Sequence, residues 1–183
     1  MITIPVGDEL RHALLACLAV PRWADDVAGR APFDSIATLI ETARQAATPL
    51  DRSEIDEALA EHPRIGEKPT GTSQAAGFSR AEQASEDADD AGLAASIVAG
   101  NRSYEQRFDR VFLIRAAGRS RREILAELHR RLALDDEAEA AIVGSELRDI
   151  ALLRLAVLAR QWQDDSVPEF ETTDTPAPTG DAR

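Results

Sequence analysis

Apolar residues recur at helical spacing along most of the chain, and this periodicity limits the possible folds most strongly. Leu10, Leu14 and Leu18 lie four residues apart, and similar spacing continues from Asp136 to Trp162. Residues three or four places apart share one face of a helix. Aromatic residues make up only 4% of the chain, whereas alanine and leucine, both good helix formers, are abundant. We therefore predict an all-α fold, a single-domain multi-helix bundle.

Capping residues and prolines predict where the helices begin and end. Asp51 with Glu54, and Ser120 with Glu123, have the spacing of a capping box. A residue before proline avoids the helical region, so the helix opened by Asp51 should end near residue 61 or 62. The predicted helices cover about residues 8–20, a segment capped by Asp34, 51–61, one or two helices within 79–108 broken near 91–92, 120–134, and 136–162.

Two segments are expected to lie outside the helices. Residues 111–116 form a short apolar run, which we expect to be extended, as a strand or as buried chain. Residues 164–183 contain proline, threonine and acidic residues with few apolar side chains, so we predict a disordered tail. The helical domain would then span residues 1–163.

Charge and composition exclude several classes of function. The formal net charge of −12 disfavours binding to nucleic acid. No apolar run reaches the length of a membrane span, and the N-terminus lacks the pattern of a secretory signal. Cys17 is the only cysteine, so no internal disulfide can form. We expect a cytoplasmic protein without nucleic-acid or membrane partners.

His62 is the histidine best placed for chemistry. It lies at a predicted helix end, on a turn constrained by Pro63 and opened by Gly66, and functional residues gather on such loops. A histidine on a turn can equally be structural. His12 and His129 lie within predicted helices, where a surface or packing role is the default.

Two further segments could bind a ligand, although each has a purely structural explanation. Ser79 and Glu82 have capping-box spacing, and the helix start that they predict could hold an anionic group. The backbone of residues 112–116 could hydrogen-bond a flat heterocycle rich in amides, or the run could simply be buried. The chain has no paired-histidine motif, CxxC, glycine-rich phosphate loop or Gly-x-Ser-x-Gly elbow, and we expect no metal site and no cofactor.

These segments together resemble one family. The chain is similar to 2-oxo-4-hydroxy-4-carboxy-5-ureidoimidazoline (OHCU) decarboxylase over about residues 8–162. The combination of His62-Pro63-Arg64-Ile65-Gly66 with Ser79-x-x-Glu82-Gln83 is the specific part of the resemblance. The other positions that carry it are Trp23, Pro32-Phe33, Glu61, Asn101-x-x-Tyr104, Arg107-Phe108, residues 112–116, Gly118-Arg119-Ser120, Glu123-Ile124-Leu125, Arg131-Leu132 and Arg154-Leu155.

The resemblance implies a cofactor-free, homodimeric, all-helical lyase that converts OHCU to (S)-allantoin in urate degradation, a part of purine metabolism. Its catalytic histidine falls on His62, and we assign Glu82 to orient that imidazole or to bind the ureido group. We expect the imidazole to titrate near neutrality. The implied substrate-binding positions are Pro63, Ser79, Glu82, Gln83, Phe112, Leu113, Ile114, Arg115 and Ala116.

Two departures from the family pattern affect substrate binding. Arg115 stands where relatives usually have cysteine, and Ala117 stands where many have a basic residue. Two alternatives remain, the first because every residue singled out also has a structural explanation and the second because of these two departures. One is a non-catalytic helical interaction module, in which His62, Glu82 and residues 112–116 would have no reason to meet. The other is the same fold acting as an isomerase or hydrolase on a related ureido heterocycle.

Overall fold

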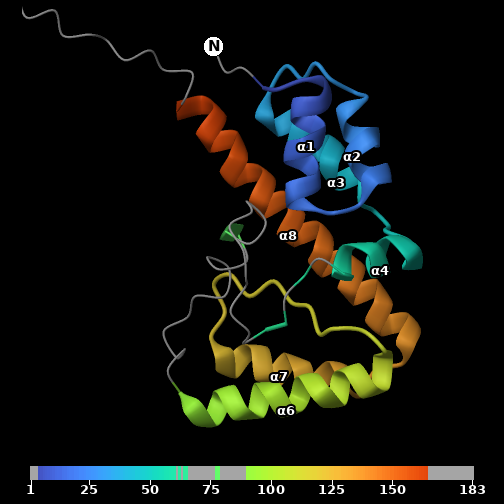
Figure 1. Ribbon diagram of the computed structural model, residues 1–183, viewed down its shortest axis with the longest axis vertical. Helices are drawn as coiled ribbons and strands as arrows, with labels where there is room; N and C mark the ends of the chain where they lie inside the picture. The colour runs from blue at the N-terminus through green and yellow to red at the C-terminus, as the bar shows by residue number, and fades with distance from the viewer. Residues whose placement is uncertain (1–3, 61, 63, 66–76, 79–89, 165–183) are drawn as a thin grey trace, which may run out of the picture.

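A long helix near the C-terminus is the element on which three other helices pack. In the computed structural model, which describes residues 4–60, 62, 64–65, 77–78 and 90–164, helix α8 (Asp136–Asp164) runs diagonally through the molecule (Figure 1). Helices α1 (Gly7–Cys17) and α3 (Ile36–Ala46) pack on α8. Helix α2 (Pro21–Ala28) lies between them in the sequence and contacts both. Helix α4 (Arg52–Ala60) also contacts α8.

Helices α6 (Ala91–Phe108) and α7 (Arg121–Arg131) form a second layer at the other end of the molecule. They lie side by side (Figure 1). Gly100 permits this close approach, because a Cβ atom added there would lie 2.6 Å from Leu128 Cδ2. The described residues contain helices and no strand, which confirms the all-α fold.

The buried apolar residues form two clusters that meet at the non-helical segment 111–116. The larger cluster joins α1–α4 to α8, and the smaller joins α6 to α7. Leu113 belongs to the larger cluster, whereas Phe112, Ile114 and Ala116 belong to the smaller one. This alternation is typical of extended chain with both faces buried. The segment is buried chain without strand pairing, which settles the two possibilities that the sequence left open.

Local capping signals predicted two helix starts correctly and one incorrectly. Asp51 and Glu54 cap α4 reciprocally, and Ser120 with Glu123 forms a complete capping box on α7. The predicted cap at Asp34 is wrong. Ser35 is the N-cap of α3, because its backbone is extended and its hydroxyl accepts the Thr38 N–H. The predicted first helix is also too long, since α1 ends at Cys17 and Pro21 begins α2.

Several predictions concern residues outside the described part of the chain. These predictions are the helix start at Ser79 and the disordered tail at residues 164–183. Of the predicted tail, the structure describes residue 164, which is the last residue of α8. The described helices include none with the length and apolarity needed to cross a membrane.

Candidate active site

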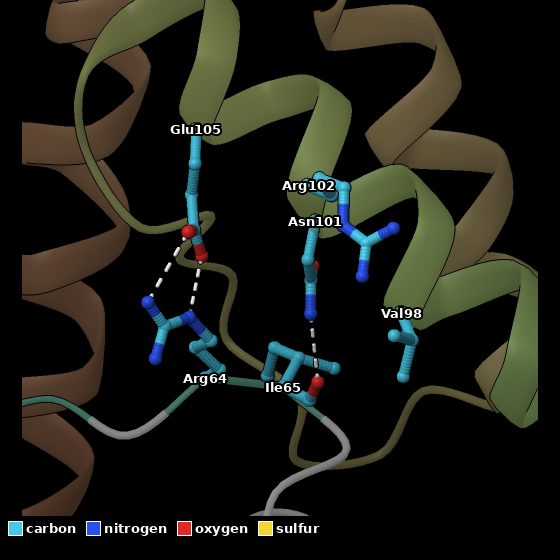
Figure 2. Close-up of a pocket in the computed structure, with 6 residues that line it drawn as sticks. All are labelled: Arg64, Ile65, Val98, Asn101, Arg102 and Glu105. Atoms are coloured by element: carbon cyan, nitrogen blue, oxygen red, sulfur yellow. Dashed lines mark hydrogen bonds and ion pairs between the residues drawn. The ribbon is translucent and has the colours of Figure 1, made fainter.

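His62 lies just beyond the end of α4, on a turn held at both sides. Its backbone N–H donates a hydrogen bond to the Leu59 carbonyl, 3.1 Å away, which extends the end of the helix. The next described residues, Arg64 and Ile65, face α6 (Figure 2). Ile65 is buried in the cluster between α6 and α7. The turn therefore connects the two apolar clusters, with the histidine between them.

The environment of His62 favours the neutral imidazole. Burial, together with the positive charge of Arg154, lowers the pKa of His62 from 6.5 to about 3. The expectation that this histidine titrates near neutrality is therefore wrong for the ligand-free protein. At pH 7 the ring is uncharged and one of its nitrogens can accept a proton.

Arg154 is a candidate site residue to which the sequence reasoning gave no role. Arg154 lies on α8 and its side chain is buried. Its Nη1 donates a hydrogen bond to the carbonyl of Cys17 at 3.3 Å. The guanidinium carbon also lies 5.7 Å from the centroid of the Phe78 ring. The available signal was an arginine within the apolar sequence Ala151 to Leu158, because charged residues are seldom buried without a purpose.

A cavity of about 290 Å³ lies beside Arg154. Its walls come from three parts of the chain: Phe78, Ala117 directly after the 112–116 segment, and α8. Both arginines in its lining, Arg154 and Arg160, lie on α8. The cavity therefore combines an apolar wall with two cations, which suits a small anionic ligand.

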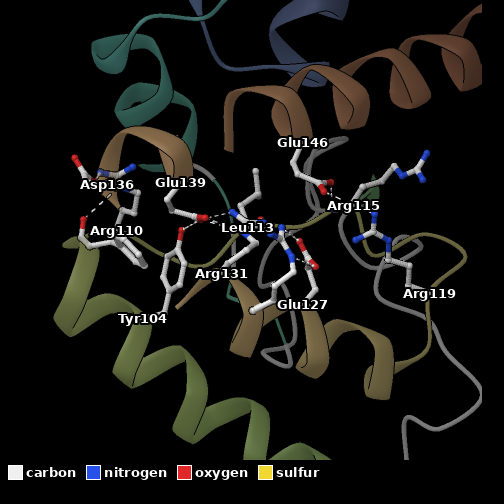
Figure 3. Close-up of polar contacts among 12 residues, drawn as sticks. Tyr104, Arg110, Leu113, Arg115, Arg119, Glu127, Arg131, Asp136, Glu139 and Glu146 are labelled. Atoms are coloured by element: carbon white, nitrogen blue, oxygen red, sulfur yellow. Dashed lines mark hydrogen bonds and ion pairs between the residues drawn. The ribbon is translucent and has the colours of Figure 1, made fainter. Parts of the chain in front are cut away.

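Two polar side chains fix the backbone of residues 112–116 (Figure 3). Arg131 Nη1 donates to the Leu113 carbonyl at 2.8 Å, and the Arg115 N–H donates to Glu146 Oε2 at 2.7 Å. Glu146 also pairs with Arg119 at 3.7 Å. The Leu113 carbonyl and the Arg115 amide thus already have protein partners, which limits the backbone groups that this segment could offer to a ligand.

Arg131 is itself held by a fully buried network. Arg131 and Glu139 are both 0% exposed, and Arg131 Nε lies 2.9 Å and 3.0 Å from the two Glu139 oxygens. Tyr104 donates its hydroxyl to Glu139. Burial and the neighbouring carboxylate raise the pKa of Tyr104, so the phenol stays protonated. The network joins α6, α7 and α8 to the 112–116 segment.

Of the predicted site residues, the structure describes His62 and residues 112–116, and His62 interacts electrostatically with Arg154. Arg154 shares a cavity with Phe78 and Ala117, and none of these three was among the predicted site residues. Pro63, Ser79, Glu82 and Gln83 lie outside the described residues, so the meeting of His62 and Glu82 stays a prediction. Among the described residues, no three His, Cys, Asp or Glu side chains are grouped so that they could hold a metal ion.

Comparison with known proteins identifies the family. The family model described as OHCU decarboxylase matches residues 7–156. A crystal structure of OHCU decarboxylase in the presence of (S)-allantoin is similar in fold, with a TM-score of 0.66 and 25% sequence identity. The similarity covers 80% of this chain and 96% of that one. Comparison with curated proteins gave no match. The match extends over most of the chain and includes His62, Arg154 and residues 112–116, and the protein therefore belongs to the OHCU decarboxylase family.

Proposed function

We propose that this protein decarboxylates OHCU to (S)-allantoin without a cofactor, as a step of urate degradation. The observation that carries the proposal is a neutral His62 under the influence of a buried arginine, in a chain of the OHCU decarboxylase family. The substrate is a carboxylate, and Arg154 beside an apolar cavity is suited to bind one.

The substrate supplies its own electron sink, which makes an organic cofactor unnecessary. When the bond to the carboxylate breaks, its electron pair forms a ring C=C bond. The π pair of the adjacent C=N bond moves to the ring nitrogen, which takes up a proton. The resulting enol then loses its hydroxyl proton and gains a proton at the neighbouring ring carbon, which gives the ring amide carbonyl of allantoin. Delivery of that proton to one face sets the (S) configuration.

His62 would act first as a base and then as an acid. A neutral imidazole can take the enol proton and return it to the ring carbon, and such help is worth about 10²–10⁴-fold in rate. An anionic carboxylate beside Arg154 would offset the charge that lowers the pKa of His62. Substrate binding would therefore raise the proton affinity of the imidazole above its value in the ligand-free protein.

The remaining site residues keep the roles expected from the family resemblance. We assign Glu82 as a second catalytic residue, which orients His62 or binds the ureido group. Substrate contacts are assigned to Pro63, Ser79, Gln83 and the segment Phe112 to Ala116. Arg154 is added as the group that binds the carboxylate. A homodimer and a cytoplasmic location stay predictions.

The test is to follow optical activity while freshly made OHCU is converted with and without the protein. OHCU decays unaided to racemic allantoin, so an active enzyme should produce faster conversion and an optically active product. His62→Ala should lose most of the activity while folding normally, and His129→Ala, which alters an exposed histidine on α7, should keep it. Near-full turnover by His62→Ala would exclude His62 as the acid and base.

Two further measurements separate the alternatives. Glu82→Gln should lose turnover while binding is kept if Glu82 acts through His62, and should lose binding if Glu82 contacts the substrate. Assays with allantoin and 5-hydroxyisourate in place of OHCU test whether the same fold acts on a related ureido heterocycle. A protein that converts none of the three compounds would fit a non-catalytic interaction module.

A further inference from the structure

Two side chains of α6 hold the turn that follows His62. Asn101 and Glu105 lie one helical turn apart and face the same segment (Figure 2). Asn101 Nδ2 donates to the Ile65 carbonyl at 3.0 Å. Arg64 Nε and Nη2 donate to the two Glu105 oxygens at 2.6 Å and 3.2 Å. These contacts fasten two consecutive residues of the turn to one helix face.

Asn101 occupies a buried position where an apolar side chain would favour stability more. Asn101 is only 6% exposed, and its Oδ1 has no hydrogen-bond partner among the described residues. Burying an amide of which one hydrogen bond out of four is made among the described residues is unfavourable compared with burying an apolar side chain of similar size. The bond to Ile65 therefore contributes geometry to the turn more than it contributes stability to the fold.

The other side of His62 is held independently. Its backbone N–H is bonded to Leu59, at the end of α4. With the α6 contacts beginning at Arg64, the histidine lies between two fixed points that are close to it in sequence. The side chain of Ile65, buried below the turn, adds an apolar anchor on the α6 side.

We propose that Asn101 and Glu105 are positioning residues for the reaction, and that they hold the turn so that the His62 imidazole stays partly buried and near Arg154. This inference rests on the proposed function, because it assigns a role in catalysis to residues that need not touch the substrate. A displacement of about 1 Å at a reacting group can reduce turnover by about 10²-fold.

Release of the turn would have two measurable effects. The imidazole would gain access to water and move away from the guanidinium of Arg154, so its pKa would rise from about 3 toward 6.5. The substrate would still meet Arg154 and the cavity, so kcat would fall more than substrate affinity. A residue that served only the stability of α6 would produce neither effect in a protein that remains folded.

The experiment compares Asn101→Leu and Glu105→Gln with the unaltered full-length protein. The His62 ring resonances, assigned by their loss in His62→Ala, are followed by NMR from pH 4 to pH 8, and kcat and KM are measured with fresh OHCU. Urea unfolding confirms that each variant is folded. In the variants we expect His62 to begin titrating within this range, and kcat to fall about 10- to 100-fold with little change in KM.

Glu127→Gln is the matched control. Glu127 accepts two hydrogen bonds from Arg130, at 2.6 Å and 2.8 Å, and its exposure of 25% is close to the 29% of Glu105. Its hydrogen-bond partner Arg130 lies on the same helix, α7, so loss of the Glu127 carboxylate should leave both the His62 titration and kcat unchanged. The double variant Arg64→Glu/Glu105→Arg, which reverses the ion pair, should recover activity relative to Glu105→Gln.

The outcomes separate this inference from the proposed function. If folded Asn101→Leu and Glu105→Gln keep His62 untitrated and keep kcat, the positioning role is overturned. If Asn101→Leu does not fold, Glu105→Gln decides by the same two criteria. If the unaltered protein does not convert OHCU, the proposed function fails, and the NMR titration alone still shows whether α6 holds His62 in place.

Discussion

The buried pair Arg131–Glu139 should be the most sensitive electrostatic contact in the described part of the protein. Both side chains are 0% exposed, and Glu139 accepts from Arg131 and from the Tyr104 hydroxyl (Figure 3). Glu139→Gln keeps the size of the side chain but removes its charge. The Arg131 guanidinium would then remain buried without a carboxylate to neutralise it, and the Gln amide oxygen, the Leu113 carbonyl and nearby aromatic rings would be its neutral partners.

The expected loss is a large share of the total stability. Removing one partner of a buried ion pair costs about 3–5 kcal/mol, whereas domains are stable by about 5–15 kcal/mol. The guanidinium carbon of Arg131 lies 4.8 Å from the centroid of the Phe112 ring. This contact exists with or without Glu139, so it does not reduce the loss of stability caused by Glu139→Gln. At roughly 2–4 °C per kcal/mol for a chain of this size, Tm should fall by about 6–20 °C.

Urea unfolding followed by far-UV circular dichroism provides the assay. Glu139→Gln should lower the midpoint urea concentration without changing the slope m, which would indicate a change in stability and not in the denatured state. Glu127→Gln removes a carboxylate from an exposed pair on α7 and should cost about 1 kcal/mol or less. A loss below about 1 kcal/mol for Glu139→Gln would refute the reasoning, because it would mean that the buried charge is otherwise compensated.

Replacement of the whole network should separate stability from positioning. The triple variant Tyr104→Phe/Arg131→Met/Glu139→Leu leaves no buried charge behind, and such replacements are often neutral or stabilising. It also leaves the Leu113 carbonyl without the donor that now fixes it. We expect this variant to be about as stable as the unaltered protein and to lose activity. Full activity would show that Arg131 does not position the 112–116 segment.

Three further predictions concern pH, the cavity and helix packing. The unfolded chain binds a proton at His62 below pH 6.5, whereas the folded protein does so only below about pH 3. The free energy of unfolding should therefore decrease as the pH is lowered from 6.5 to 3. At pH 5 this contribution of His62 lowers the free energy of unfolding by at most about 2 kcal/mol. The contribution should be absent when the free energies of unfolding of His62→Gln at pH 7 and pH 5 are compared. Arg154→Gln should raise KM for OHCU by about 10- to 100-fold, through loss of a charged hydrogen bond, and an unchanged KM would exclude a carboxylate contact. Gly144→Ala should stabilise by up to about 1 kcal/mol, since its Cβ would lie at an ordinary 3.5 Å from Ile55, whereas Gly100→Ala should destabilise by about 1–2 kcal/mol in urea unfolding.

The parts of the fold that depend on neighbouring residues could be predicted from the sequence. The capping boxes at Asp51 and Ser120 each join residues three places apart, so their pattern is visible in the chain itself. The failure at Asp34 has the same origin. Two adjacent residues, Asp34 and Ser35, are both suitable caps, and only the backbone conformation decides between them.

The parts of the site that depend on distant contacts could not be predicted. Asn101 is 36 residues from Ile65, and Arg154 is 137 residues from Cys17, so no local pattern joins them. The pKa of His62 also depends on burial and on Arg154, neither of which periodicity describes. The family resemblance indicated that Asn101 and Arg154 matter, but the structure was needed to suggest what they do.

The acidity of the chain and the negative charge of the proposed substrate are compatible because the two act over different distances. The net charge of −12 is distributed over a surface in contact with salt water, where a charge is largely screened beyond about 8 Å. Arg154 is only 5% exposed, so its field is screened much less, and it lies where the cavity meets the core. A ligand in that cavity experiences Arg154 and Arg160 more strongly than the distant carboxylates. His62 is kept neutral first by its own burial and then by the positive charge of Arg154, so the arginine proposed to bind the carboxylate also acts on the proposed base.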